Sequence, residues 1–125
     1  MIDVLIVDDN PHIRKLLGVT LSREFRVMEA EDGISAMDTI LRFSPKVVLL
    51  DIMMPSEIDG LQLLDAIKCN PATSGTVIGM VTARGQVSDE TIAKQKGADA
   101  YFVKPFSPQA VHDWVREKII GSGEA

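Results

Sequence analysis

The sequence predicts a doubly wound α/β domain built on a parallel β-sheet, and three observations support this prediction. Short apolar segments alternate along the chain with longer segments in which apolar residues recur at helical spacing. Acidic residues directly follow two of the short segments, as expected where a parallel sheet presents its carboxyl edge. The length of 125 residues corresponds to one domain. Alternating strands and helices of this kind form a parallel sheet with helices on both faces.

Five apolar segments have the length of β-strands. The runs Val4-Leu5-Ile6-Val7 and Val47-Val48-Leu49-Leu50 contain no polar residue, which is typical of strands buried on both faces. The predicted strands are residues 3–7, 26–30, 46–50, 77–82 and 100–103.

Five segments between and after these strands have the period of amphipathic helices. Asn10-Pro11 favours the start of the first helix, because asparagine caps helices and proline fits the first helical position. Ser44-Pro45 and Asn70-Pro71 are expected to end the second and third helices, and Ser88 to cap the fourth. The predicted helices are residues 11–22, 33–43, 60–68, 88–96 and 107–120.

Composition and charge argue against several classes of protein. A net charge of −5 disfavours direct contact with nucleic acid, which usually requires a basic face. No apolar run approaches the ~20 residues of a membrane span, and the acidic Asp3 and Asp8 do not fit a signal peptide. Cys69 is the only cysteine, which fits a reducing cytoplasm, and its expected role is packing near a helix end. We therefore expect a cytoplasmic protein without membrane or direct nucleic-acid contacts.

Three acidic residues are placed to form one site. Asp8 and Asp9 follow the first predicted strand, and Asp51 follows the third. Because the carboxyl ends of parallel strands share one edge of the sheet, these side chains should converge in one cleft. Two ionised carboxylates ~4 Å apart repel by about 4 kcal/mol at an effective dielectric of 20, so the cluster requires a cation or a proton. Oxygen-rich pockets of this kind suit Mg²⁺.

Two further strand ends offer groups that bind phosphate. Thr82 ends the fourth predicted strand, and Lys104 follows the fifth. A hydroxyl and an ammonium are the donors that non-bridging phosphoryl oxygens accept. Either residue alone is weak evidence, because threonine and lysine are common everywhere. Together with three acids at corresponding strand ends, they predict a metal-assisted phosphate site.

This arrangement resembles the receiver domain of two-component response regulators, the CheY-like superfamily, over essentially the whole chain. The resemblance implies a flavodoxin-like fold in which five parallel strands in the order 2-1-3-4-5 are flanked by five helices. The matching stretches are Val7-Asp8-Asp9-Asn10, Leu50-Asp51-Ile52-Met53-Met54-Pro55, Asp59-Gly60-Leu61, Val81-Thr82-Ala83, Gly97-Ala98-Asp99-Ala100-Tyr101 and Lys104-Pro105-Phe106.

The resemblance also implies a role for each acid. Asp51 would be the phosphoacceptor, whose carboxylate receives a phosphoryl group from a phosphohistidine on a histidine kinase or a phosphotransfer protein. Asp8, Asp9 and Asp51 would hold Mg²⁺, one of the paired acids through water, and Met53 would contribute only its backbone carbonyl. The metal would offset the charge of about −1.5 to −2 that phosphorylation brings into the acidic cleft.

A switch follows from the same resemblance. Lys104 would pair with the phosphate, and Thr82 would move toward it and donate its hydroxyl. Tyr101 would then enter the vacated space; the alternative is a tyrosine at the sheet edge with its hydroxyl in water. The surface of the fourth helix, fifth strand and fifth helix would report the change to a downstream protein or a C-terminal output domain, or form a phosphorylation-dependent dimer.

Rival classes of function fit the sequence less well. A phosphatase with an aspartate nucleophile needs a second acid two residues later, where this chain has Met53. A nucleotide-binding module needs a glycine-rich turn where Asp8-Asp9-Asn10-Pro11 stands. A degenerate receiver, used as a phosphorylation-independent interaction module, would not need the complete residue set. We therefore expect a phosphoacceptor signalling domain of a phosphorelay rather than an enzyme, apart from phosphoryl transfer to itself and slow self-dephosphorylation.

Domain limits and two local departures complete the predictions. Residues 1–120 are expected to form the receiver domain, and 121–125 a flexible tail or a truncated linker, so the chain is a stand-alone receiver or part of a longer regulator. The loop from Pro55 to Gly60 should be one residue longer than is common in the family. Met53 and Arg84 would flank the phosphate, and neither could readily orient an attacking water.

Overall fold

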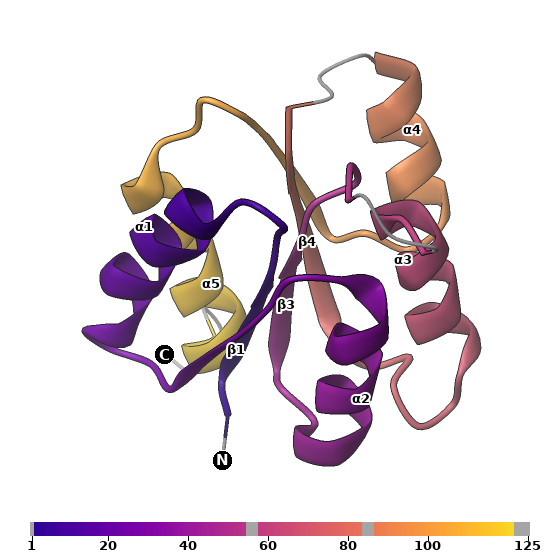
Figure 1. The fold of residues 1–125 in the computed structure, drawn as a ribbon, viewed down its shortest axis with the longest axis horizontal. Helices are drawn as coiled ribbons and strands as arrows, with labels where there is room; N and C mark the ends of the chain where they lie inside the picture. Colours follow the sequence, from indigo (N-terminus) through magenta and orange to yellow (C-terminus); the bar gives the residue numbers. More distant parts are fainter. Residues whose placement is uncertain (1, 55–57, 84–86, 122–125) are drawn as a thin grey trace.

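A computed structural model of the chain has a five-stranded parallel sheet between two layers of helices (Figure 1). It describes residues 2–54, 58–83 and 87–121. The strand order β2-β1-β3-β4-β5 confirms the predicted topology. The strands are β1 (Val4–Val7), β2 (Val27–Ala30), β3 (Val47–Leu50), β4 (Val77–Thr82) and β5 (Ala100–Val103), and the helices are α1 (Pro11–Ser22), α2 (Gly33–Phe43), α3 (Gly60–Cys69), α4 (Val87–Gln95) and α5 (Pro108–Ile120).

The alternation of side chains along the central strands explains the two helical layers. On β1, Val4 and Ile6 pack in a cluster with α1 and α5, whereas Leu5 and Val7 pack in a second cluster with α2, α3 and α4. Figure 1 shows the same division, with α1 and α5 together on one side of the sheet. Strands covered on both faces need apolar residues at every position, which accounts for the unbroken apolar runs.

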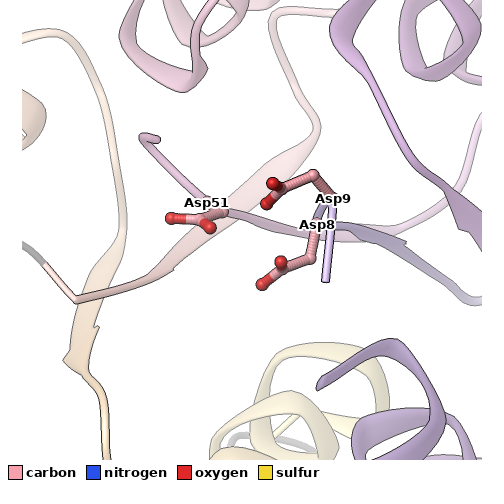
Figure 2. Close-up of side chains that lie close together, drawn as sticks. All are labelled: Asp8, Asp9 and Asp51. Carbon is pink, nitrogen blue, oxygen red and sulfur yellow. The ribbon is translucent and has the colours of Figure 1, made fainter. Parts of the chain in front are cut away.

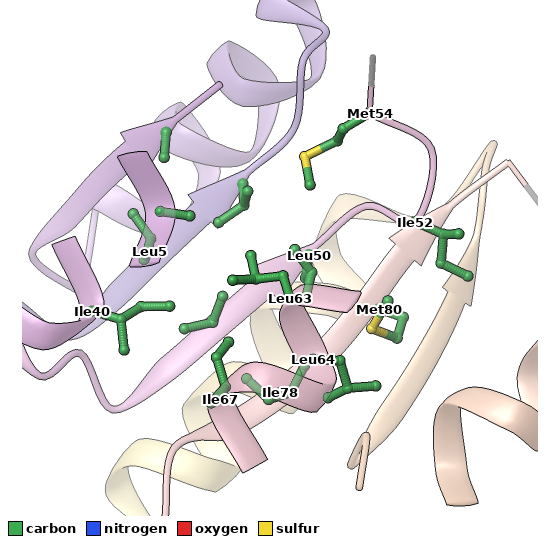
Figure 3. Close-up of a cluster of buried hydrophobic side chains, with 14 of the residues drawn as sticks. Leu5, Ile40, Leu50, Ile52, Met54, Leu63, Leu64, Ile67, Ile78 and Met80 are labelled. Carbon is green, nitrogen blue, oxygen red and sulfur yellow. The ribbon is translucent and has the colours of Figure 1, made fainter. Parts of the chain in front are cut away.

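The larger apolar cluster anchors the carboxyl ends of the central strands (Figure 3). Leu50, Ile52 and Met80 belong to it and are at most 1% exposed. Full burial of a side chain of this size contributes about 1.5–3 kcal/mol. The residues before and after Asp51 are therefore fixed in the core, which limits how far Asp51 can move.

The helix boundaries agree with the sequence to within one residue, and the caps explain most of them. The Asn10 side chain accepts the His12 backbone N–H at 2.9 Å and begins α1. The predicted cap of α4 is wrong, because this helix begins at Val87 and Ser88 lies inside it. In the described part of the chain, no helix combines the length and the apolar character that a membrane span requires.

The packing role expected of Cys69 is also wrong. Cys69 is exposed at the last position of α3, whereas Leu64 and Ile67 of the same helix are buried against the sheet. Residues two apart on a helix point in nearly opposite directions, so the burial of Ile67 turns Cys69 toward solvent.

Candidate functional site

Asp8, Asp9 and Asp51 converge at the carboxyl edge of the sheet (Figure 2). A carboxylate oxygen from each residue lies within 4.8 Å of the corresponding oxygens of the other two. Val7 pairs with Leu50 in the register of β1 and β3, so both strands end at the same level. Asp8 and Asp51 are buried, and Asp9 is exposed. The cluster therefore has two buried acids and one acid on its solvent side.

The two buried acids have the same local geometry. The Asp8 carboxylate accepts the backbone N–H of Asn10 at 2.9 Å, and the Asp51 carboxylate accepts that of Met53 at 3.2 Å. A bond from an aspartate to the N–H two residues later is a local turn that fixes the side chain as the chain leaves the strand. Each carboxylate is thus oriented by its own loop before any ligand binds.

Helix α3 fixes the backbone beside Asp51. The Gly60 N–H donates to the Ile52 carbonyl oxygen at 2.9 Å. A Cβ at position 60 would lie 2.0 Å from the backbone oxygen of Asp51, so only glycine permits this approach. Asp59 and Gln62 form a reciprocal capping box that starts the helix at this point. The stretch Asp59-Gly60-Leu61 therefore contacts the backbone at Asp51 and Ile52 and fixes its position.

Lys104 supplies a positive charge to the cluster. Its Nζ lies 2.9 Å from Oδ2 of Asp8 and 3.2 Å from Oδ2 of Asp51. Its backbone N–H donates to the Thr82 carbonyl oxygen at 2.8 Å, which holds the end of β5 beside the end of β4. With all four side chains ionised, the three carboxylates and the ammonium leave two negative charges, which equals the charge that one divalent cation would neutralise.

The pKa values of Asp8 and Lys104 are both raised, but by different main causes. Burial raises the pKa of Asp8, and the nearby charge of Asp51 adds to this, against the lowering effects of the bonds from Asn10 and Lys104. Burial opposes the charged form of Lys104, but its bond to Asp8 and the negative charges of Asp51 and Asp8 outweigh burial and raise the pKa of Lys104. The raised pKa of Asp8 thus reflects mainly its burial, whereas the raised pKa of Lys104 reflects the two carboxylates beside it.

Thr82 and Tyr101 lie on neighbouring strands next to the acids. Thr82 is wholly buried at the end of β4, and Tyr101 is half-buried on β5, where it packs against the larger apolar cluster. In the register of these strands Met80 pairs with Tyr101, and Thr82 pairs with Val103. Because alternate residues of a strand share a face, Thr82 and Tyr101 project from the same face of the sheet.

Met53, which was also singled out from the sequence, lies at the margin of the site. Met53 follows Asp51 at a distance of two residues and its side chain is exposed. The loop from Pro55 to Gly60, predicted to be one residue longer than is common, includes residues 55–57, which are outside the described ranges, as is Arg84.

Sequence reasoning missed Arg14. Its guanidinium donates to the backbone carbonyl oxygen of Asp8 at 2.7 Å and pairs with Glu29 at 3.2 Å. In the sequence Arg14 has the appearance of a solvated residue on an amphipathic helix. The available clue was its position: it lies one helical turn after Asn10, where a long side chain can reach back over the acid pair.

The fold and the cleft together define a class of protein: a doubly wound domain with an acidic cleft, compatible with a metal ion, at the carboxyl edge of its sheet. The model of the response regulator receiver domain matches residues 4–116, and the chain belongs to this family. As a receiver domain, it is a phosphoacceptor component of two-component signalling.

Similarity to individual proteins agrees with this assignment. The chain is 39% identical over 110 residues to the transcriptional regulatory protein SrrA of Staphylococcus aureus, a match that covers 87% of this chain and 44% of SrrA. The chain thus spans less than half the length of the curated relatives it matches first.

Solved receiver domains have the same fold. The receiver domain of NtrX from Brucella abortus superposes with a TM-score of 0.87 at 31% identity, covering 96% of this chain and 100% of that chain. The BeF3-activated receiver domain of DrrB, from Thermotoga maritima, also has a TM-score of 0.87, at 25% identity, covering 96% of this chain and 98% of that chain.

Proposed function

We propose that this domain accepts a phosphoryl group on Asp51 from a phosphohistidine of a histidine kinase or a phosphotransfer protein. An oxygen of the Asp51 carboxylate would attack the phosphorus atom, the phosphorus–nitrogen bond would break, and the imidazole would remain on the donor protein. One observation carries the proposal: Asp51 lies with Asp8 and Asp9 within 4.8 Å while it accepts a bond from Lys104. The residues that we propose as nucleophile, metal ligands and phosphate partner thus lie in one cleft.

The residues present fit a bound Mg²⁺ ion. The cluster offers hard carboxylate oxygens and carries two uncompensated negative charges when ionised, the conditions that this ion prefers. Asp8, Asp9 and Asp51 would hold it, together with the backbone carbonyl of Met53 and waters. When bound, the ion would supply charge neutralisation for the transferring phosphoryl group.

The protein side chains would then stabilise the product and transmit the change. Lys104, now bonded to Asp8 and Asp51, would pair with the new phosphate. Thr82 would turn from its buried position to donate its hydroxyl to the phosphate. Tyr101 projects from the same face one strand away, which supports its entry into the space that Thr82 leaves. The surface of α4, β5 and α5 would change as a result.

The remaining proposals concern the wider system. Residues 1–120 would be the receiver domain and Gly121 the start of a tail or linker, of which residues 122–125 are outside the described part of the chain. The match to part of a transcriptional regulatory protein supports a C-terminal output domain or a downstream protein as the partner. A phosphorylation-dependent dimer and a cytoplasmic location belong to the same proposal. Slow self-dephosphorylation is expected, because the exposed thioether of Met53 cannot orient water as an acid or amide would.

Phosphorylation by a small donor tests the proposal directly. Incubation with acetyl phosphate and Mg²⁺ should add the mass of one phosphoryl group, and hydroxylamine should remove it because the product is an acyl phosphate. Asp51→Asn should abolish labelling, since an amide is not a comparable nucleophile. Asp65→Asn is a matched control, because Asp65 pairs with Lys96 away from the cleft. Labelling of Asp51→Asn at the level of the parent would refute the assignment, and continuous release of phosphate without a labelled protein would favour a phosphatase.

A further inference from the structure

Arg14 lies outside the acid cluster but contacts the segment that carries two of its members. One Nη donates to the backbone carbonyl oxygen of Asp8 at 2.7 Å, and Nε pairs with an Oε of Glu29 at 3.2 Å. The Arg14 side chain is only 17% exposed. Glu29 belongs to the neighbouring strand β2, so the guanidinium joins the first residue beyond β1 to the edge of the sheet.

Arg14 holds this segment at both ends. Its backbone N–H donates to the Asn10 carbonyl oxygen at 3.1 Å, while its side chain binds the Asp8 carbonyl oxygen. Asp8 is the first residue after β1. Its N–H donates to the Ala30 carbonyl oxygen of β2 at 3.1 Å, as a strand residue would, whereas its own carbonyl oxygen accepts from the Arg14 guanidinium. Asp9 lies between the two residues that Arg14 holds. Arg14 thus contacts the backbone on both sides of Asp9, but only the contact with Asp8 is made by its side chain.

We infer that Arg14 is a positioning residue for metal binding, which fixes the Asp8-Asp9 turn while Glu29 orients the guanidinium. This inference rests on the proposed Mg²⁺ site. A planar guanidinium binds a carbonyl and a carboxylate through donors in a rigid fork, whereas the donors of a lysine ammonium rotate and fix neither partner's direction. Loss of a group that orients metal ligands typically weakens metal affinity about 10–100-fold.

Simple electrostatics predicts that removal of Arg14 changes the Mg²⁺ affinity in the opposite direction from loss of positioning. A positive charge near a cation site repels the cation, so its removal by itself should strengthen Mg²⁺ binding. Positioning predicts weaker binding after the same substitution. The sign of the change therefore separates the two effects, which a loss of activity alone would not do.

Calorimetric titration with Mg²⁺ alone provides the experiment, with Arg14→Met as the main variant. Its dissociation constant should rise about tenfold. Lys15→Met is the matched control, because Lys15 is the next residue on α1, is exposed and carries the same charge; its affinity should stay equal or increase slightly. The Mg²⁺ dissociation constant of Arg14→Lys should lie between those of Arg14→Met and the parent. Glu29→Gln should also fall between them, since it leaves the bond to Asp8 in place.

A second readout covers the case in which Arg14→Met folds poorly. In the metal-free protein the Asn10 amide, which is bonded to the Asp8 carboxylate, should exchange its hydrogen faster in Arg14→Lys than in the parent. Amides within β3 should exchange at unchanged rates. Failure of the parent to bind Mg²⁺ would refute the proposed metal site itself. A parent that binds, with Arg14 variants that bind equally or more tightly and an Asn10 amide that is unchanged, would overturn the positioning role alone.

Discussion

Asp9→Asn should reverse its effect on stability when Mg²⁺ is added. Asp9 is exposed, so an amide can replace its carboxylate without a packing change. In the metal-free protein the substitution removes one negative charge from a cleft with excess negative charge, and it should therefore stabilise the fold. In saturating Mg²⁺ the same substitution removes a proposed ligand, and the parent should become the more stable protein.

The magnitude follows from the distances. A carboxylate 4.8 Å from another carboxylate is repelled by about 3.5 kcal/mol at an effective dielectric of 20. Asp9 has two such neighbours, Asp8 and Asp51, but Lys104 partly neutralises them and solvent screens an exposed charge. Exposed charge interactions usually contribute at most about 1 kcal/mol. We therefore expect a gain of about 1 kcal/mol without metal, or about 4 °C in the unfolding temperature of a domain of this size.

Thermal unfolding at several Mg²⁺ concentrations is the assay. Binding to the folded state stabilises the parent by about 2.7 kcal/mol when the free metal is 100 times the dissociation constant, and a variant that binds poorly gains little. Glu31→Gln is the matched control, because Glu31 is an exposed acid after β2 that does not belong to the cluster. The reasoning fails if Asp9→Asn gains as much stability from Mg²⁺ as the parent, or if it lowers the stability of the metal-free protein.

Three further predictions test the cleft. The pKa of Asp8 is raised in the folded chain, so ionisation of this carboxyl group destabilises the metal-free fold as pH rises through the raised value. Asp8→Asn should therefore be more stable than the parent at neutral pH, and this advantage should shrink on acidification toward pH 4. An advantage independent of pH in denaturant titrations would contradict the prediction. Gly60→Ala should cost about 3 kcal/mol of stability, because its Cβ would overlap the backbone oxygen of Asp51, and unchanged denaturant unfolding would contradict it. Thr82→Ala should still be phosphorylated but should show a weaker NMR response at Tyr101 to beryllofluoride. The variant lacks the proposed hydrogen bond from the Thr82 hydroxyl to the phosphate, and a hydrogen bond to a charged group contributes about 1.5–3 kcal/mol. Equal responses in the variant and the parent would refute the switch role of both residues.

The sequence was sufficient for the parts of the structure that depend on local pattern. The strands β1 and β3 were predictable from their apolar runs, because strands covered on both faces are apolar at nearly every position. The convergence of Asp8, Asp9 and Asp51 followed from topology, since parallel neighbours in register bring their carboxyl ends together. Knowledge of side-chain directions was unnecessary for these predictions.

Contacts between distant parts of the chain were harder to predict from the sequence. Lys104 was expected at the correct edge, but its two bonds to buried acids depend on how β4 and β5 end beside each other. Arg14 was missed because helical periodicity assigns it to a partly solvated face, and only the folded chain brings it to Glu29. The errors at Cys69 and Ser88 both concern helix ends, which a sequence pattern locates least well: α3 continues one residue further than predicted, to Cys69, and α4 begins one residue earlier, at Val87.

The position of Lys104 suggests how charge and conformation would be coupled if the proposed switch operates. Among the described residues, it is the cation bonded to both buried acids, and its backbone is bonded to Thr82. A phosphate on Asp51 would draw the ammonium away from Asp8, because a dianionic group attracts it more strongly than a single carboxylate. Asp8 would then depend more on the metal for its counter-charge, so that phosphate and metal would stabilise each other's binding. Mg²⁺ should accordingly bind more tightly to the beryllofluoride-treated domain than to the free domain, and by linkage the phosphate mimic should bind more tightly when Mg²⁺ is present. Titration of each ligand at fixed concentrations of the other would measure this coupling, and independent binding of the two would show that Lys104 does not connect them.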